Sequence, residues 1–234
     1  MKQLIHWVAV CCLIGVSGMA SAERLEVFRW QANSSSPEGL VQGMMAAAKI
    51  HEKHGATVGI FRMDVGASGY PTFDYVLRWD SGEAWAKTKE TNFNEDWQAF
   101  WAQASQSPSG TLLFSLEGLN WDASVKAADF AEDGPFRVYV WQPNPGKSAA
   151  VYAAFTKAAE MHTAMGAKVN IYQEGVGGNG KVHYVLSFED WAAMADFGDK
   201  VAASEEFRFL QAAFSDAATP INSIQGEPLY YTSQ

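Results

Sequence analysis

Hydrophobic and polar positions follow two periods along this chain, and the two periods come in the same order twice. Apolar residues at every second position are typical of strands with one buried face, and apolar residues three and four apart are typical of helices. The period of two predicts strands at residues 25–31, 57–63, 72–79, 111–117, 136–142, 168–173, 181–188 and 221–226. The helical period predicts helices near 38–54, 149–165 and 190–215, and a broken helix before residue 111.

Short polar residues mark where some helices begin. Asp80 and Glu83 form a predicted capping box, in which side chains accept hydrogen bonds from the first backbone N–H groups of the helix. Asn94, before the run EDWQAFWAQ, is predicted to restart a helix after a break. Ser204 occupies the matching place in the second half. Each half therefore contains, in order, strand, helix, strand, strand, helix and strand.

The two halves are related in sequence as well as in pattern. Residues 27–61 and 138–172 are identical at 11 of 35 positions, against about two expected by chance at average composition. The matches include VFRWQAN with VYVWQPN, and His51 with His162. The offset between the halves changes slightly where loops are expected, as it does in a diverged duplication. We therefore interpret the chain as a tandem repeat.

This element order in each half is the ferredoxin-like arrangement. Such a unit has helices on one sheet face only, so we expect the two bare faces to cover each other. The element order, the duplication and the aromatic second helices (EDWQAFWAQ and EEFRFLQAAF) resemble the dimeric α+β barrel superfamily over nearly the whole chain. That superfamily includes antibiotic-biosynthesis monooxygenases, stress-responsive barrel proteins and NIPSNAP proteins. The resemblance implies an α+β fold of two tandem ferredoxin-like (βαββαβ) repeats, packed sheet-to-sheet as an intramolecular dimeric α+β barrel.

The N-terminal segment has the pattern of a cleavable secretory signal. A lysine at position 2 is followed by a short apolar run over residues 4–16 and by Ala20-Ser21-Ala22, a small-x-small site. The run is too short to span a membrane. The expected organisation is a signal peptide at 1–22, a first repeat at 23–119, an acidic linker at 120–134 and a second repeat at 135–234. We expect a periplasmic or secreted protein without stable membrane insertion.

Charge and cysteine content exclude several classes of function. The chain has 26 acidic and 17 basic residues, a formal charge of −9, so it should repel nucleic acid. Both cysteines, Cys11 and Cys12, lie in the predicted signal. The mature chain would therefore have no disulfide, no thiolate metal site and no cysteine nucleophile.

Alternation also predicts which face of each strand is inside. Large aromatic residues occupy one face, and small helix residues such as Ala48 and Ala159 offer space for them, so this face should lie under the helices. The opposite, mixed face should line the barrel interior. The aromatic face consists of Phe28, Trp30, Phe73, Tyr75, Leu77, Trp79, Tyr139, Trp141, Tyr184, Leu186 and Phe188. The polar residues of the interior face are Arg29, Gln31, Asp74, Arg78, Gln142, His183 and Ser187.

Two interpretations of these interior residues remain open. Buried charges need partners or water, so Asp74 could simply form an ion pair with Arg29 or Arg78 that holds the two sheets together. Alternatively, the group lines a ligand cavity. In that case His183 and Asp74 are the candidate acid–base residues, in possible contact with each other.

The duplicated histidines have a structural and a functional interpretation. His51 and His162 lie on the helix face that meets the sheet, and a hydrogen bond to a backbone carbonyl or a strand side chain would account for each. Alternatively they ligate haem, because some barrel relatives place a haem-binding histidine on a helix beside the sheet.

The sequence supports three hypotheses about function. The first is an exported, monomeric barrel that binds a small apolar or aromatic molecule without cofactor or metal, with Arg29, Gln31, Arg78, Gln142 and Ser187 as ligand-binding candidates. The second is a cofactor-independent monooxygenase-like or isomerase-like enzyme that uses the same cavity. The third is a haem-binding or haem-degrading barrel.

Overall fold

The computed structural model describes residues 22–33, 36–69 and 71–232. Nearly all of the predicted signal peptide, residues 1–21, lies outside this part of the chain. The strands are β1 (Arg24–Ala32), β2 (Thr57–Val65), β3 (Thr72–Trp79), β4 (Gly110–Asn120), β5 (Phe136–Pro143), β6 (Lys168–Glu174), β7 (Val182–Ser187) and β8 (Ala218–Tyr231). The helices are α1 (Pro37–Lys53), α2 (Gly82–Lys89), α3 (Glu95–Ala104), α4 (Ser148–Ala164), α5 (Trp191–Ala203), α6 (Glu205–Ala213) and the short 3-10 helix η2 (Ala127–Phe130).

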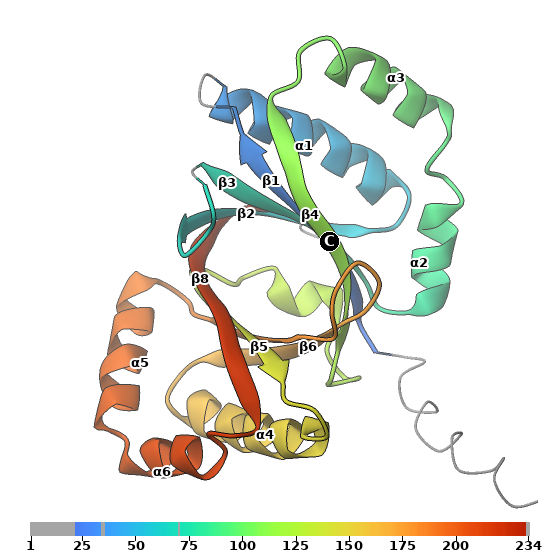
Figure 1. Ribbon diagram of the computed structural model, residues 1–234. Helices are drawn as coiled ribbons and strands as arrows, with labels where there is room; N and C mark the ends of the chain where they lie inside the picture. Colours follow the sequence, from blue (N-terminus) through green and yellow to red (C-terminus); the bar gives the residue numbers. More distant parts are fainter. Residues whose placement is uncertain (1–21, 34–35, 70, 233–234) are drawn as a thin grey trace, which may run out of the picture.

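The eight strands form one closed antiparallel barrel (Figure 1). The first half contributes the order β4-β1-β3-β2, and the second half contributes the corresponding order β8-β5-β7-β6. The halves join where β2 pairs with β8 and where β4 pairs with β6. Both edges of each half-sheet are therefore paired within the chain, and the α+β barrel of two ferredoxin-like repeats is confirmed.

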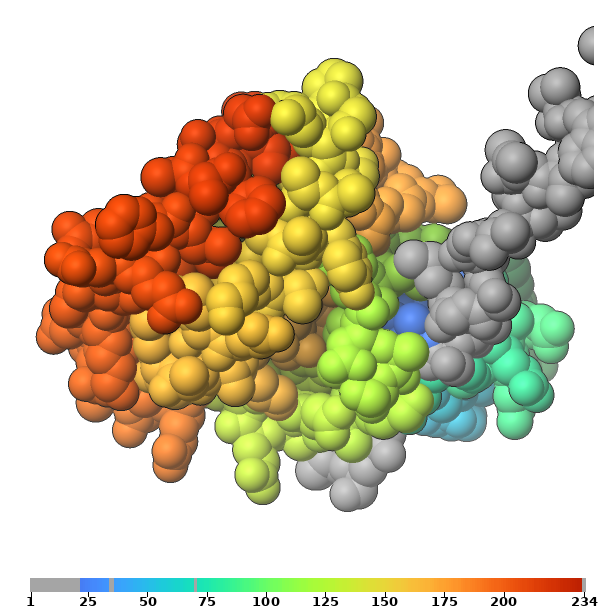
Figure 2. Space-filling model, turned by 90° about the horizontal axis from the view of Figure 1, so that it is seen from below, coloured from blue at the N-terminus to red at the C-terminus, as the bar shows by residue number. Residues whose placement is uncertain are grey.

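Helices cover the outside of the barrel, and the predicted aromatic faces of the strands pack against them. In the first half, Tyr75, Leu77 and Trp79 are buried against α1 residues that include Met44 and Ala48. The second half has a corresponding cluster under α4 and α5. Seen from below, α4, α5 and α6 cover the second half (Figure 2). The alternation rule thus assigned the outer faces of β1, β3, β5 and β7 correctly, because these faces pack on apolar helix side chains.

Two of the three predicted helix starts are confirmed, and one is wrong. The side chains of Asn94 and Ser204 cap α3 and α6 by accepting backbone N–H bonds. The capping box at Asp80 is not formed, because α2 begins one residue later with Ser81 as its N-cap. Asp80 instead accepts a hydrogen bond from the backbone of Ala127, 2.7 Å away, in the segment between the repeats.

That segment, residues 120–134, is a packed part of the barrel as well as a connection. It contains η2, and its Phe130 is buried against Leu25, Val76 and Tyr172 of the barrel interior. The hydroxyl of Tyr231 donates to the carbonyl of Ala127 at 2.5 Å. In Figure 1 the segment, drawn in yellow-green, lies within the outline of the strand ring. It therefore closes one end of the barrel.

Candidate functional site

The space between the two sheets holds a cavity of about 420 Å³. Most of its wall is apolar, and Phe130 from the connecting segment forms part of its closed end. Phe114 and Ile221 line the cavity and are also 38% and 51% exposed, so it reaches solvent beside these strands. The interior is therefore not a solid, ion-paired core. The apolar lining includes Leu25, Val27, Phe61, Met63, Val76, Leu116, Phe136, Val138, Val140, Val185 and Ile224.

The structure brings five of the seven predicted interior residues together. Those that line the cavity are Arg29, Asp74, Arg78, His183 and Ser187. The other two, Gln31 and Gln142, are half-buried near the C-terminal ends of β1 and β5 and are not part of the cavity wall. Alternation assigns a residue to a face of the sheet but does not say how far along the barrel it lies.

Arg29 and Asp74 form a buried, two-pronged ion pair. Arg29 Nε and Nη2 each donate to one carboxylate oxygen of Asp74, both at 2.7 Å. The guanidinium lies over the ring of Phe114, 4.9 Å from its centroid. β1 and β3 are neighbours in one half-sheet, with Arg29 and Asp74 in register. The pair therefore ties two strands of the same sheet and does not hold the two sheets together.

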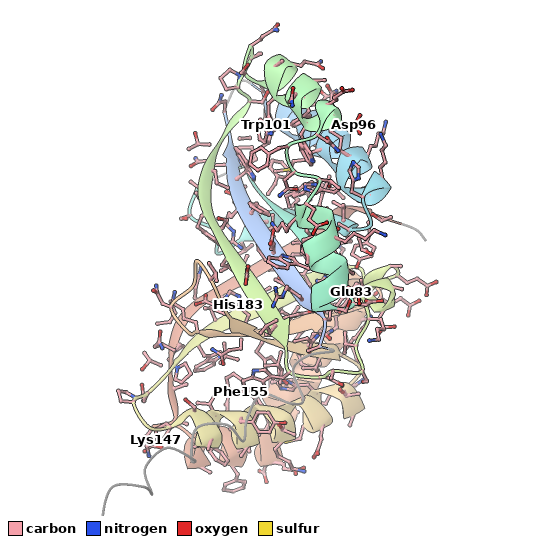
Figure 3. The ribbon with its side chains drawn as sticks, turned by 90° about the vertical axis from the view of Figure 1, so that its right-hand side faces the viewer. Glu83, Asp96, Trp101, Lys147, Phe155 and His183 are labelled. Atoms are coloured by element: carbon pink, nitrogen blue, oxygen red, sulfur yellow. The ribbon has the colours of Figure 1, made fainter. Side chains whose placement is uncertain are left out.

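His183 has Glu174 as its partner in the structure, and the hypothetical contact with Asp74 is not formed. His183 Nε2 lies 2.8 Å from Glu174 Oε1. Figure 3 shows His183 between the two halves of the barrel. The sequence interpretation missed Glu174, although it is two residues beyond Tyr172 on β6 and so shares the same inward face.

Glu174 is held as a carboxylate. Its second oxygen, Oε2, accepts hydrogen bonds from the backbone N–H groups of Asn179 (2.7 Å) and Lys181 (3.1 Å) in the loop after β6. Burial by itself raises the pKa of this carboxyl, but the hydrogen bonds from His183 and from the loop outweigh burial and lower the pKa to about 2.

A second charged network closes the far end of the cavity. Arg78 Nη1 donates to Glu23 at 2.5 Å and to the hydroxyl of Tyr172 at 2.8 Å. Asn120 also donates to Glu23, whose side chain is fully buried. The guanidinium of Arg78 lies over the ring of Phe130, 3.8 Å from its centroid. Burial raises the pKa of the Tyr172 hydroxyl well above its usual range, so this group remains protonated.

Ser187 is tied to the connecting segment. Its hydroxyl donates to Asp133 at 2.7 Å, and the other carboxylate oxygen of Asp133 bonds Lys168 at 2.8 Å. This arrangement leaves Ser187 in a structural contact at the closed end, with no histidine as its hydrogen-bond partner.

The duplicated histidines make the same contact in both halves. His51 Nδ1 lies 2.8 Å from the hydroxyl of Tyr75, and His162 Nδ1 lies 2.9 Å from the hydroxyl of Tyr184. Each tyrosine is on the outer face of a central strand, so each pair joins a helix to the sheet. This is the strand side-chain contact expected from the structural interpretation.

These two imidazoles are not placed to hold a haem. Both lie between helix and sheet, outside the cavity, and aromatic rings pack on them: Trp97 on His51, and Phe197 with Phe207 on His162. Figure 3 shows how side chains such as Phe155 fill the space between α4 and the sheet. A flat macrocycle would have to displace these rings, so the residues present do not fit haem at either position.

Two further properties concern the described part of the chain. It contains no group of three His, Cys, Asp or Glu residues arranged to hold a metal ion. No helix within it is both long and apolar enough to cross a membrane.

Solved structures share this architecture at low sequence identity. A candidate monooxygenase from Fusobacterium nucleatum aligns with 92% of this chain and 96% of its own, at 14% identity and a TM-score of 0.62. An anthrone oxidase-like protein aligns over 93% and 95%, at 11% identity and a TM-score of 0.59. A haem-binding protein from Thermus thermophilus aligns over 89% and 92%, at 9% identity and a TM-score of 0.52.

At these identities the likeness concerns the fold alone. No family model and no curated protein matches the sequence. The chemistry of the site must therefore be argued from the residues of this chain.

Proposed function

We propose that this protein, which has the fold of the dimeric α+β barrel superfamily with both ferredoxin-like units in one chain, binds a small, neutral, largely apolar or aromatic molecule between its two sheets. The observation that carries the proposal is the cavity of about 420 Å³ with its mainly apolar wall. Cavities of roughly 300–1,000 Å³ with apolar walls and a few polar groups are typical of small-molecule sites.

The charges around the cavity favour a neutral ligand. Each described ionic group in the wall has an opposite charge beside it: Arg29 with Asp74, Arg78 with Glu23, Asp133 with Lys168, and Glu174 with Lys181 at 4.0 Å. A charged ligand would have to break one of these pairs or lie unpaired in an apolar space, and both are unfavourable. Apolar surface provides the main free energy of binding here.

A neutral fluorescent probe tests this proposal. N-phenyl-1-naphthylamine should bind with a stoichiometry near one and increase in fluorescence. Val138→Trp should strongly reduce this increase, because Val138 lines the cavity and an indole there would occupy space that the probe needs. Val65→Trp is the matched control, since Val65 is 62% exposed. Unchanged binding in a folded Val138→Trp protein would place the probe elsewhere and contradict the proposal.

We also propose that the chain is exported with cleavage after Ala22, on the strength of the N-terminal pattern. The expected first residue of the mature protein is then Glu23. N-terminal sequencing of protein from a periplasmic or culture fraction measures this directly. Recovery of the chain in the cytosol with residues 1–22 intact would contradict it.

A further inference from the structure

We infer that His183 and Glu174 form a general-base pair that removes a proton from carbon in a neutral ketone bound in the cavity. The inference rests on the proposed function, since it requires that such a molecule enters the barrel. It goes further because it assigns a reaction, a substrate class and separate roles to two residues.

The first argument concerns which nitrogen of His183 carries the proton. An ionised carboxylate accepts hydrogen bonds but has none to donate. Glu174 Oε1 lies 2.8 Å from Nε2 of His183, so Nε2 carries the hydrogen and donates it. In the neutral ring, Nδ1 then holds the lone pair, which is the form required of a base.

The second argument concerns the surroundings of His183 Nδ1, the nitrogen that holds this lone pair. No hydrogen-bond partner contacts Nδ1 of His183 among the described residues. The side chain is 21% exposed and forms part of the cavity wall. The histidines at 51 and 162 differ in both respects, since their Nδ1 atoms bond tyrosines and they lie outside the cavity. Among the described histidines, His183 is therefore the one that lines the cavity and has a ring nitrogen without a hydrogen-bond partner.

The third argument concerns how firmly Glu174 is held. Its side chain is 3% exposed, and the two loop N–H groups fix Oε2. The loop passes so close that a Cβ on Gly178 would lie 2.7 Å from Oε2. Glu174 is therefore a positioning residue: it orients the imidazole and stabilises the imidazolium that forms when Nδ1 takes a proton.

The fourth argument concerns the negative charge that develops on the ligand. Arg29 uses Nε and Nη2 on Asp74, while its Nη1 has no partner among the described residues. Arg29 lines the same cavity as His183. A ketone oxygen that becomes an enolate would accept a hydrogen bond from Nη1, and such donors stabilise developing charge strongly in an apolar site.

The reaction balances without an oxidant. His183 Nδ1 takes the proton of a C–H bond next to the carbonyl, and the bonding pair forms a carbon–carbon double bond as the carbonyl pair moves to oxygen. The imidazolium then returns a proton to the same carbon, or to a conjugated carbon further along. The net result is hydrogen exchange or isomerisation of the ketone.

Deuterium exchange of 2-tetralone, a neutral bicyclic ketone, tests the inference. The ketone should displace N-phenyl-1-naphthylamine from the intact protein, and proton NMR in D₂O should show exchange next to its carbonyl above the buffer rate. General bases typically contribute about 10²–10⁴-fold. We therefore expect His183→Gln to reduce protein-dependent exchange at least about 100-fold while the displacement is retained.

Two further variants separate the roles. Glu174→Gln should lower the exchange rate at saturation at least about tenfold and leave the half-saturating ketone concentration unchanged, since an amide no longer fixes the tautomer. His54→Gln removes a histidine outside the cavity wall and should change neither value.

The outcomes distinguish the two proposals. Displacement of the probe with exchange at the buffer rate, or exchange that survives His183→Gln, overturns the base assignment and leaves the binding function intact. Probe binding without displacement by 2-tetralone overturns the ketone assignment. Absence of probe binding overturns the proposed function, and the inference with it.

Discussion

The two helix histidines show what a single residue pair contributes in each half. Burial lowers the pKa of both His51 and His162 to about 4, with the nearby charge of Lys89 adding to the effect at His51. Burial also raises the pKa of the Tyr75 and Tyr184 hydroxyls, so the tyrosines remain protonated. Both pairs are therefore neutral contacts between a helix and the sheet, which suits positions among aromatic rings.

These shifts predict a loss of stability in mild acid. The folded pKa of about 4 lies below the ordinary value of 6.5, so the unfolded chain binds more protons than the folded one between these values. The contribution of these two histidines to the free energy of unfolding is therefore complete above pH 6.5 and is lost as the pH falls toward 4. At pH 5 the loss should be about 1–2 kcal/mol for each ring.

Urea unfolding at pH 7 and pH 5 measures this loss, and the double variant His51→Gln/His162→Gln should lose most of this pH dependence. Equal dependence in the variant would assign the effect to other groups.

The buried ion pair in the cavity wall leads to a second residue-scale prediction. Asp74→Ala leaves the Arg29 guanidinium buried without its partner, which typically destabilises by about 3–5 kcal/mol. The double variant Arg29→Met/Asp74→Leu should recover much of that stability, because it leaves no unpaired charge. Chemical denaturation of wild type and the variants gives the comparison. A single Asp74→Ala substitution with no effect on unfolding would show that the guanidinium finds water or another partner.

At the scale of elements, the loops after β2 and β6 pack on the opposite half of the barrel in equivalent ways. Gly66 follows β2 and Gly177 follows β6, 111 positions apart, and both have left-handed φ values, 83° and 81°. A Cβ on Gly66 would lie 1.9 Å from the carbonyl oxygen of Ser223, and one on Gly177 would lie 2.4 Å from that of Ser115. The loop at Gly66 thus packs on the backbone of β8, and the loop at Gly177 packs on the backbone of β4, in each case a strand of the other half. Only glycine allows this approach.

Gly177→Ala should therefore destabilise more than an ordinary left-handed glycine would. Gly146 is the matched control, because its φ is 75° but nothing lies within 4 Å of a Cβ there. Gly146→Ala should lose about 1–2 kcal/mol from backbone strain alone. Gly177→Ala should lose more, because strain and overlap with Ser115 act together. Thermal unfolding of the two variants measures the difference, and equal losses would mean that the loop shifts without cost.

At the scale of the whole molecule, the duplication explains why one chain can form the complete barrel. A ferredoxin-like half exposes one sheet face and two edge strands, all of which attract a partner. Here the second half covers that face, and the β2–β8 and β4–β6 pairings use the edges. The two clusters under the helices are separate, while the cavity lies between the sheets.

We therefore predict a monomer in solution. Sedimentation equilibrium at micromolar concentrations should give the mass of a single chain over a tenfold range of concentration. A stable dimer across that range would show that another surface, outside the barrel junctions, associates.

The sequence by itself determined the order of elements, the duplication and the outer faces of β1, β3, β5 and β7. Periodicity carries this information because a strand side chain points in or out by its position alone, as Tyr75 and Tyr184 illustrate. Only the tertiary structure decided which neighbours the inward polar groups meet. Asp74 bonds Arg29 and not Arg78, and His183 bonds Glu174, because register between strands sets those distances. Likewise, residues 120–134 look like an acidic linker in sequence, but Phe130 closes the barrel because an apolar interior was available to bury it.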